Sequence, residues 1–489
     1  MNFEKIADKI GEIGYVTQVV DTLVYANGIP GAKPDEVIVF ETGEMGQILS
    51  LLSDTVEILT FSDKPIKVGT RLTRTGSTLK IPVGNELLGK IIDPFGNSLD
   101  SVEKVKKPQE ERQVNTEPSG IMARETIKKY FETGLSLVDL MIPLGKGQRE
   151  LVIGDRKTGK TSFLLHTIYT QAKQGDICIY ACVGKRKIDI KKAEEFFVKN
   201  KIMDKVIIIA STSTDPAGVI YITPYSAMSL AEYFRDSGKD VLVVLDDMST
   251  HAKFYREISL LGKRFPGRNS YPGDIFYVHA KLVERAGNFS NKQGENAITC
   301  LPVVDTTQGD LSGYIQTNLM SMTDGHLFFD GNLFYQGRRP AVNPFLSVTR
   351  VGRQTQSDVR RSINRELTSF LSLYERVQNF IHFGSELNES AKVTLDMGSK
   401  IMKLFDQPAG DLIPGNVQIL AFAFLWGNIL QNETIDGLIG RRKKMIDLYQ
   451  KDEKFKKNLD SFIESAATLN ELMAKIKQDG TIIPDIIKL

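Results

Sequence analysis

The sequence predicts a multidomain protein with a small N-terminal β-barrel, a central α/β domain built around a phosphate-binding loop, and a C-terminal α-helical bundle. Three observations lead to this prediction. Short β-like runs separated by turn residues fill residues 11–72, strand and helix signals alternate from residue 133, and helical periodicity takes over after about residue 357. We therefore expect domains at residues 1–72, 73–356 and 357–489.

Composition excludes several classes of protein. The chain has 489 residues, 41% of them hydrophobic and 25% charged, which is typical of a globular protein with two to four domains. The net charge of +2 creates no global attraction for nucleic acid or anionic lipid. Three cysteines without metal-site spacing indicate a reducing compartment. The longest apolar run, residues 419–427, is too short to span a bilayer, so we expect membrane association only through partners.

The N-terminal segment reads as several short strands. Apolar runs at residues 15–20, 36–40 and 55–59 are separated by turn pairs such as Asn27-Gly28, and such spacing indicates a small closed barrel. No aromatic stripe with interleaved basic residues follows these strands, so we do not expect the barrel to bind nucleic acid.

A phosphate-loop motif follows in the central domain. The pattern G-x-x-x-x-G-K-[ST] lies between an apolar run at residues 151–153 and a helical segment at residues 162–171. Such a turn directs backbone N–H groups and a helix N-terminus at phosphate. We expect Lys160 to reach the outer phosphates and Thr161 to ligate Mg²⁺. The predicted nucleotide-binding residues of the loop are Gly154, Asp155, Arg156, Lys157, Thr158, Gly159, Lys160 and Thr161.

Further apolar strands follow the loop, with helical segments between most of them, and this alternation predicts a mostly parallel, helix-covered sheet. Asp246 follows the strand at residues 241–245, where the strand ends of a parallel sheet line the ligand crevice. Its carboxylate is our candidate for holding Mg²⁺ through water. Asp247 is either a helix cap or a hinge. The predicted strands are residues 150–153, 178–183, 206–210, 241–245 and 298–302.

Five segments carry a resemblance to a known family. They closely resemble the α subunit of F-type ATP synthases, and the resemblance runs from about residue 14 to beyond residue 440. It implies a RecA-like central domain that binds ATP or ADP with Mg²⁺. It also implies a ring in which three α and three catalytic β subunits alternate around a central γ-type rotor shaft. The segments are residues 82–93, 145–161, 266–274, 343–353 and 383–387.

One position distinguishes a catalytic from a non-catalytic site in this family. β-type subunits place a Glu in a Gly-Glu-Arg turn, where it accepts a proton from the attacking water. The corresponding residue here is Lys185, in Gly184-Lys185-Arg186, and a charged ammonium has no acceptor. We therefore expect a site that binds nucleotide without hydrolysing it, with Lys185 facing a phosphate. The alternative is that Lys185 faces solvent.

Arg350 matches the family's arginine finger, which reaches into the neighbouring β-type site. A planar guanidinium with five donors suits the charge that spreads in a phosphoryl-transfer transition state. Arg353, three residues further on, is a rival donor.

Three residues match the family's contacts to the adenine side of the nucleotide, namely Arg339, Pro340 and Gln407. The second Gln that the family carries in this loop corresponds to Ala409 here, which leaves one base-edge hydrogen bond without its donor.

The resemblance also implies a location and partners. We expect a peripheral protein on the cytoplasmic side of a bacterial membrane, linked through other subunits to a membrane sector that translocates ions, and taking part in ATP synthesis or hydrolysis. Only about a dozen residues precede the first barrel strand, where the family has a further helical stretch that binds the peripheral stalk. A specialised F-type-like ATPase without the usual stalk and membrane sector, such as one linked to motility, is therefore the first alternative. The others are an RNA translocase, which would need a catalytic Glu in the turn, and a self-assembling export ATPase, which Lys185 disfavours.

Overall fold

The computed structural model describes residues 3–99, 108–291, 294–382, 389–408, 410–429 and 434–478. The chain folds as two compact units. Unit 1 comprises Met1–Thr126, Lys146–Ile153 and Gln171–Asp324, and unit 2 comprises Ile127–Gly145, Gly154–Thr170 and Gly325–Leu489. The chain passes into unit 2 within strand β12 (Glu150–Asp155) and returns within helix α3 (Lys160–Gln174), so both elements that flank the phosphate loop are shared.

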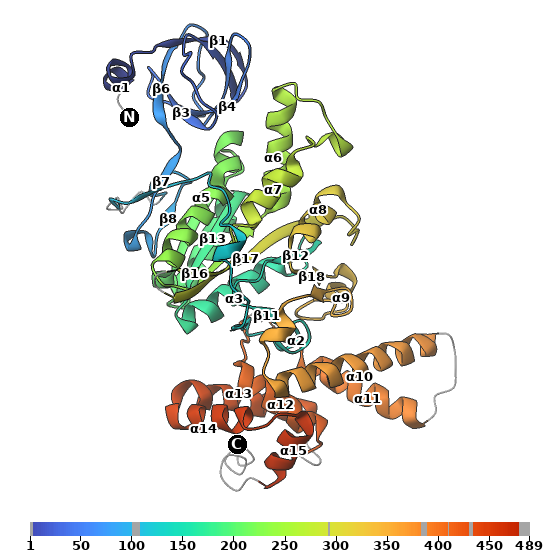
Figure 1. Cartoon of the computed structure of the whole chain (residues 1–489). Helices are drawn as coiled ribbons and strands as arrows, with labels where there is room; N and C mark the ends of the chain where they lie inside the picture. Colours follow the sequence, from blue (N-terminus) through green and yellow to red (C-terminus); the bar gives the residue numbers. More distant parts are fainter. Residues whose placement is uncertain are drawn as a thin grey trace. The chain divides into compact units, whose positions relative to one another are not determined.

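Unit 1 begins with a closed six-stranded barrel, drawn in blue in Figure 1. Its neighbours are antiparallel and follow the order β1-β2-β5-β4-β3-β6. Alternate apolar side chains, among them Val24, Ile38 and Ile58, fill its core. The predicted barrel is confirmed, although its last strand runs beyond residue 72. The strands are β1 (Gly14–Val20), β2 (Leu23–Asn27), β3 (Glu36–Phe40), β4 (Met45–Leu51), β5 (Val56–Thr60) and β6 (Arg71–Thr78).

The larger sheet of unit 1 follows the order β12-β17-β15-β13-β14-β8, and the neighbours from β17 to β8 are parallel. Strands β14 and β15 are buried along their whole length, which is typical of a parallel sheet covered on both faces. Helix α5 packs against β13, β14 and β15. The strands are β8 (Ile91–Ile92), β13 (Ile177–Lys185), β14 (Val206–Thr212), β15 (Val241–Asp246) and β17 (Gly294–Thr306).

The remaining elements of unit 1 connect or cover these two sheets. The strands are β7 (Lys80–Pro82), β9 (Glu111–Gln113) and β16 (Gly287–Asn291). The α-helices are α1 (Phe3–Ile10), α4 (Lys187–Lys199), α5 (Ala217–Asp236), α6 (Met248–Leu261), α7 (Ile275–Val283) and α8 (Tyr314–Met322). The 3-10 helices are η1 (Asn85–Leu87), η2 (Ile121–Ala123), η3 (Met203–Lys205) and η4 (Arg268–Ser270).

Unit 2 is mostly helical, as the C-terminal periodicity predicts. Helix α12 contains most of the long apolar run and is almost entirely buried, so that run forms the centre of a helical core. The strands are β10 (Tyr130–Phe131), β11 (Leu144–Gly145), β18 (Gly325–Phe329) and β19 (Val348–Thr349). The helices are α2 (Ser136–Met141), α9 (Gly331–Tyr335), η5 (Gly352–Thr355), α10 (Asp358–His382), α11 (Glu389–Leu404), α12 (Gly415–Trp426), α13 (Ile435–Lys451), α14 (Glu453–Glu464) and α15 (Leu469–Gln478).

A buried carboxylate in unit 2 connects the segment around α2 with helix α12. Asp139 of α2 accepts hydrogen bonds from the backbone N–H and the hydroxyl of Thr133, both at 2.8 Å. It also accepts from the Gly134 N–H at 2.9 Å and from the amide of Gln418, on α12, at 2.8 Å. Burial raises the pKa of Asp139 above its ordinary value, although Gln418 and Thr133 lower it. All four donors point at one carboxylate, so helix α12 is fixed against the segment that precedes the phosphate loop.

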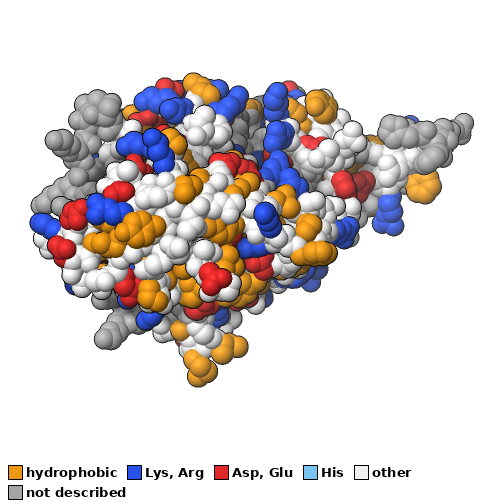
Figure 2. All heavy atoms as spheres, turned by 90° about the horizontal axis from the view of Figure 1, so that it is seen from above, with side chains coloured by type: hydrophobic (Ala, Val, Ile, Leu, Met, Phe, Trp, Pro, Cys, Tyr) orange, Lys and Arg blue, Asp and Glu red, His pale blue; other side chains and the backbone are white. Residues whose placement is uncertain are grey.

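Within the described ranges, no helix is both long and apolar enough to cross a membrane. Acidic and basic side chains are interspersed on the face that Figure 2 draws, with hydrophobic side chains between them.

Candidate functional site

The phosphate loop lies between the end of β12 and the start of α3. Gly154 approaches the neighbouring strand so closely that a Cβ at this position would lie 2.3 Å from the carbonyl oxygen of Phe329. Phe163 of α3 contacts the ring of the same Phe329, with 5.5 Å between the ring centroids. The first glycine of the motif is therefore required by packing, and the loop is anchored on both sides.

The loop lysine is folded onto its own loop. Lys160 is 7% exposed, and its Nζ donates to the carbonyl oxygens of Gly154 at 2.7 Å and Asp155 at 2.6 Å. The Thr158 hydroxyl donates to the Asp155 carbonyl at 2.7 Å. Thr161 is exposed at the start of α3, where its hydroxyl is open to a ligand. An ammonium held by neutral carbonyls can exchange them for a phosphate oxygen, which is a stronger, charged acceptor.

Lys185 lies at the carboxyl ends of the central strands of unit 1. Its Nζ is 2.7 Å from Oδ1 of Asp246 and 3.3 Å from Oδ2 of Asp247. Burial, the largest influence, lowers the pKa of Lys185, but Asp246 and Asp247 raise it and leave it above its ordinary value. The ammonium is therefore retained at neutral pH and cannot accept a proton. The alternative in which Lys185 faces solvent is wrong, since its side chain is only 24% exposed and ion-paired.

Asp246, the candidate metal residue, ends β15 as the sequence predicts. Its side chain is 4% exposed, and the hydroxyl of Tyr180 donates to its Oδ2 at 2.7 Å. Burial raises the pKa of Asp246, while Lys185 lowers it. Asp247 is a helix cap, because its carboxylate accepts from the Thr250 N–H in the first turn of α6 at 2.6 Å.

Carboxylate and hydroxyl oxygens, which Asp246 and Thr161 provide, are suitable ligands for Mg²⁺. The two residues lie in different units, so their meeting at one ion stays a prediction. At Asp246 the fit is incomplete, because the Lys185 ammonium already occupies one carboxylate oxygen.

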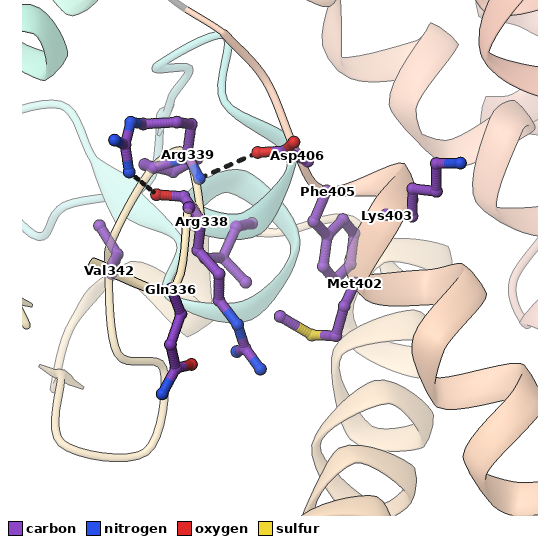
Figure 3. Close-up of a pocket in the computed structure, with 11 residues that line it drawn as sticks. Gln336, Arg338, Arg339, Val342, Met402, Lys403, Phe405 and Asp406 are labelled. Carbon is purple, nitrogen blue, oxygen red and sulfur yellow. Dashed lines mark hydrogen bonds between the residues drawn. The ribbon is translucent and has the colours of Figure 1, made fainter. Parts of the chain in front are cut away.

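The predicted adenine side contains a cavity of about 190 Å³ in unit 2. In Figure 3, Met402 and Phe405 form one wall, and Arg338 and Gln336 lie opposite. Arg339 and Pro340 belong to the lining. The Arg339 guanidinium lies over the Phe334 ring, 3.7 Å from its centroid, and donates to the Phe334 carbonyl at 2.9 Å. The Arg339 guanidinium is therefore engaged by Phe334 in this arrangement.

Gln407 directly follows the lining residues Phe405 and Asp406 in sequence, but it does not belong to the cavity lining itself. Its amide donates to the Gly134 and Asp411 carbonyls at 3.1 and 2.8 Å, and its oxygen accepts from the Ser136 N–H at 2.6 Å. The side chain is 3% exposed. Gln407 thus fixes the loop to the start of α2, and in this arrangement it offers no free polar atom to a base. Ala409 lies outside the described residues.

Sequence reasoning missed the hydrophobic wall formed by Met402 and Phe405. Phe405 directly precedes the Asp406-Gln407-Pro408 turn, and an aromatic residue beside a predicted base contact is the signal that could have identified it.

Arg350 follows β19 and is exposed, as is Arg353. The backbone around them is fixed. The Thr349 hydroxyl donates to the Pro143 carbonyl at 2.9 Å, and a Cβ on Gly352 would lie 1.7 Å from that same carbonyl oxygen. A rigid turn that presents an exposed guanidinium is a geometry suited to reaching a separate molecule.

The chain is similar to proteins of known families over most of its length. A model of the nucleotide-binding domain of the ATP synthase alpha/beta family matches residues 134–349, and a model of the C-terminal domain of ATP synthase alpha/beta chains matches residues 356–485. The ATP synthase subunit alpha of Ligilactobacillus salivarius is 37% identical over 97% of this chain and 93% of the relative. That of Limosilactobacillus fermentum is 36% identical over 97% of this chain and 90% of the relative. That of Lactobacillus helveticus is 36% identical over 90% of this chain and 87% of the relative.

Proposed function

Since the chain belongs to the ATP synthase alpha/beta family and is an alpha-type, nucleotide-binding subunit of a rotary ATPase, we propose that its own site holds MgATP or MgADP without hydrolysing it. We further propose that it supplies Arg350 to the catalytic site of a neighbouring β-type subunit, during synthesis or hydrolysis of ATP.

The observation that carries the non-catalytic assignment is the ion pair of Lys185. Hydrolysis requires an acceptor that orients and deprotonates water near the outermost phosphate. The residue in this turn is an ammonium held at 2.7 Å by Asp246, and ammonium groups only donate. A side chain that cannot accept a proton supports nucleotide storage rather than turnover.

The phosphate loop supports the nucleotide-binding part of the proposal. The donors for the phosphates would be the Lys160 ammonium and the backbone N–H groups from Gly154 to Thr161, at the N-terminus of α3. Mg²⁺ supplies charge neutralisation of the phosphates when it is bound. Thr161 would hold it, and Asp246, which is already paired with Lys185, is the second residue proposed to do so. The base would enter the cavity beside Pro340, where Met402 and Phe405 offer apolar contact.

The proposal extends to partners and location. Exposed Arg350 is free to serve a β-type neighbour in an alternating ring of six subunits around a γ-type shaft. We place this ring at the cytoplasmic face of a bacterial membrane, where other subunits form the sector that translocates ions. No contact to nucleic acid is part of this function.

The test is a comparison of binding and turnover in the purified full-length chain. We expect calorimetry to detect MgATP binding, and phosphate release to stay at background, because the position of the family's catalytic Glu holds the Lys185 ammonium, which cannot accept a proton. Lys160→Ala should abolish the binding. Robust turnover that disappears in Lys160→Ala would contradict the proposal, because the chain would then contain its own catalytic site.

A further inference from the structure

Lys185 engages the carboxylate that would otherwise be available to a metal ion. Its Nζ lies 2.7 Å from Oδ1 of Asp246, and the Tyr180 hydroxyl donates to Oδ2 at 2.7 Å. Both oxygens of this buried carboxylate therefore have a partner, and one of the partners is a full positive charge.

The backbone holds Lys185 in this position. Gly184 has φ +61°, and a Cβ there would lie 2.8 Å from Cγ2 of Thr250 on α6. The Gly184 N–H donates to the Ser211 hydroxyl at 3.1 Å, and the Lys185 carbonyl accepts from the Ser213 N–H at 3.0 Å. These contacts fix the turn against β14 and α6, so the ammonium points to the end of β15.

The charges of the cluster have a direct consequence. Lys185, Asp246 and Asp247 together carry a formal charge of −1 (one cation and two carboxylates), whereas a neutral residue at 185 would leave −2. In the proposed nucleotide site, where phosphates would lie beside this cluster, the extra negative charge would have to be neutralised by a cation. A resident ammonium already provides part of that neutralisation and repels a second cation from the same carboxylate.

We infer that Lys185 acts as a built-in substitute for part of the metal's charge, so that this site binds ATP and ADP with a weakened dependence on Mg²⁺. The inference rests on the proposed nucleotide site and deepens it: Lys185 determines which form of the nucleotide, free or Mg²⁺-bound, the subunit retains.

The experiment measures the affinity of the full-length chain for ADP by calorimetry, in excess Mg²⁺ and in EDTA without Mg²⁺. Lys185→Gln removes the charge, and Lys185→Arg keeps it. Arg186→Gln is the matched control, because Arg186 is the next residue and also basic, but is 73% exposed and pairs with Asp189 in its own helix turn. We express the dependence on Mg²⁺ as the affinity in excess Mg²⁺ divided by the affinity in EDTA. We expect this ratio to rise about tenfold or more in Lys185→Gln, within the usual range of coupling between two ligands. It should stay unchanged in Lys185→Arg and Arg186→Gln.

The outcomes separate the two proposals. An unchanged ratio in Lys185→Gln overturns the inference, whether both affinities stay the same or both fall by the same factor. An equal fall would mean that Lys185 contacts phosphate without competing for Asp246. Absence of binding in the unchanged chain under both conditions would instead refute the proposed nucleotide site itself.

Discussion

At the scale of single residues, the same chemical group has different roles in this chain according to its neighbours. Lys160 is held by two neutral carbonyl oxygens of its own loop, whereas Lys185 is held by two carboxylates. A phosphate oxygen is a stronger, charged acceptor than the carbonyls that hold the first ammonium, whereas the second ammonium cannot leave without exposing buried negative charge. Arg350, in contrast, is exposed on a fixed turn.

We predict that Arg350→Ala cripples hydrolysis by the reconstituted ring while nucleotide binding at this chain's own site is preserved. An arginine finger acts in the transition state, and fingers supplied by another chain contribute about 10³- to 10⁵-fold in rate. Lys at position 350 should not rescue the rate, because an ammonium cannot offer two parallel donors in fixed geometry. Steady-state ATPase assays of the ring measure the effect.

Arg353→Ala is the control for this prediction, since Arg353 is equally exposed three residues further on. If Arg353→Ala is the crippling change and Arg350→Ala is mild, the finger has been assigned to the wrong arginine. If both are mild, the chain supplies no finger.

The sequence does not predict which side chains of the site contact one another when those residues are far apart in the chain. The motif predicts the loop residues because its pattern is local, with strand, turn and helix contiguous in the chain. The partners of Lys185 are about sixty residues away in sequence, and only the parallel pairing of β13 and β15 brings Cys182 opposite Asp246 and Lys185 close to it. The resemblance predicts that Gln407 contacts the adenine base. Its side chain instead makes three hydrogen bonds to residues 134–136 and 411, and these depend on packing that no local sequence pattern encodes.

At the scale of elements, hydrophobic patterning predicted most strands within a few residues. The run at residues 241–245 became β15 (Val241–Asp246), and the run at residues 206–210 became β14 (Val206–Thr212), because continuous apolar runs of this length have few alternatives to a buried strand. Strand β6 continues to Thr78, beyond the expected end of the barrel, since its polar residues Thr73 and Thr75 give no apolar alternation to follow.

The hydrogen-bonded connection between α2 and α12 should contribute measurably to the free energy of unfolding. We predict that Asp139→Asn lowers the free energy of unfolding by about 1–3 kcal/mol. Each carboxylate oxygen accepts from two of the four donors, so the NH₂ group of an amide would face two donors and leave them without their acceptor. Urea denaturation of the full chain, followed by circular dichroism, measures the change.

Asp358→Asn is the matched control, because Asp358 is exposed and pairs with Arg361 one turn along α10. That change should stay within about 0.5 kcal/mol. Equal effects of the two substitutions would show that the buried carboxylate does not stabilise the connection.

At the scale of the whole molecule, membership of the family implies a ring with beta subunits, and we propose that the barrel packs beside its neighbours as a collar of that ring. We predict that removal of residues 1–78 prevents assembly with the β-type partner while the remainder still binds some MgATP. The deletion ends at Thr78 so that no part of β6 is left unpaired. Native mass spectrometry of the mixed subunits reports assembly, and calorimetry reports nucleotide binding. A truncated chain that still forms rings would refute the collar role.

The closed barrel has a consequence for the subunit before it meets its partners. Every strand from β1 to β6 has a hydrogen-bonded neighbour on both sides over part of its length, and β1 closes the barrel against β6 through Gly14 and Tyr15. Open edges are the surfaces through which newly made chains aggregate or add strands to one another. We therefore expect a neighbour to contact this end of the chain mainly through side chains and turns, and we expect the closed barrel to limit strand addition between free subunits.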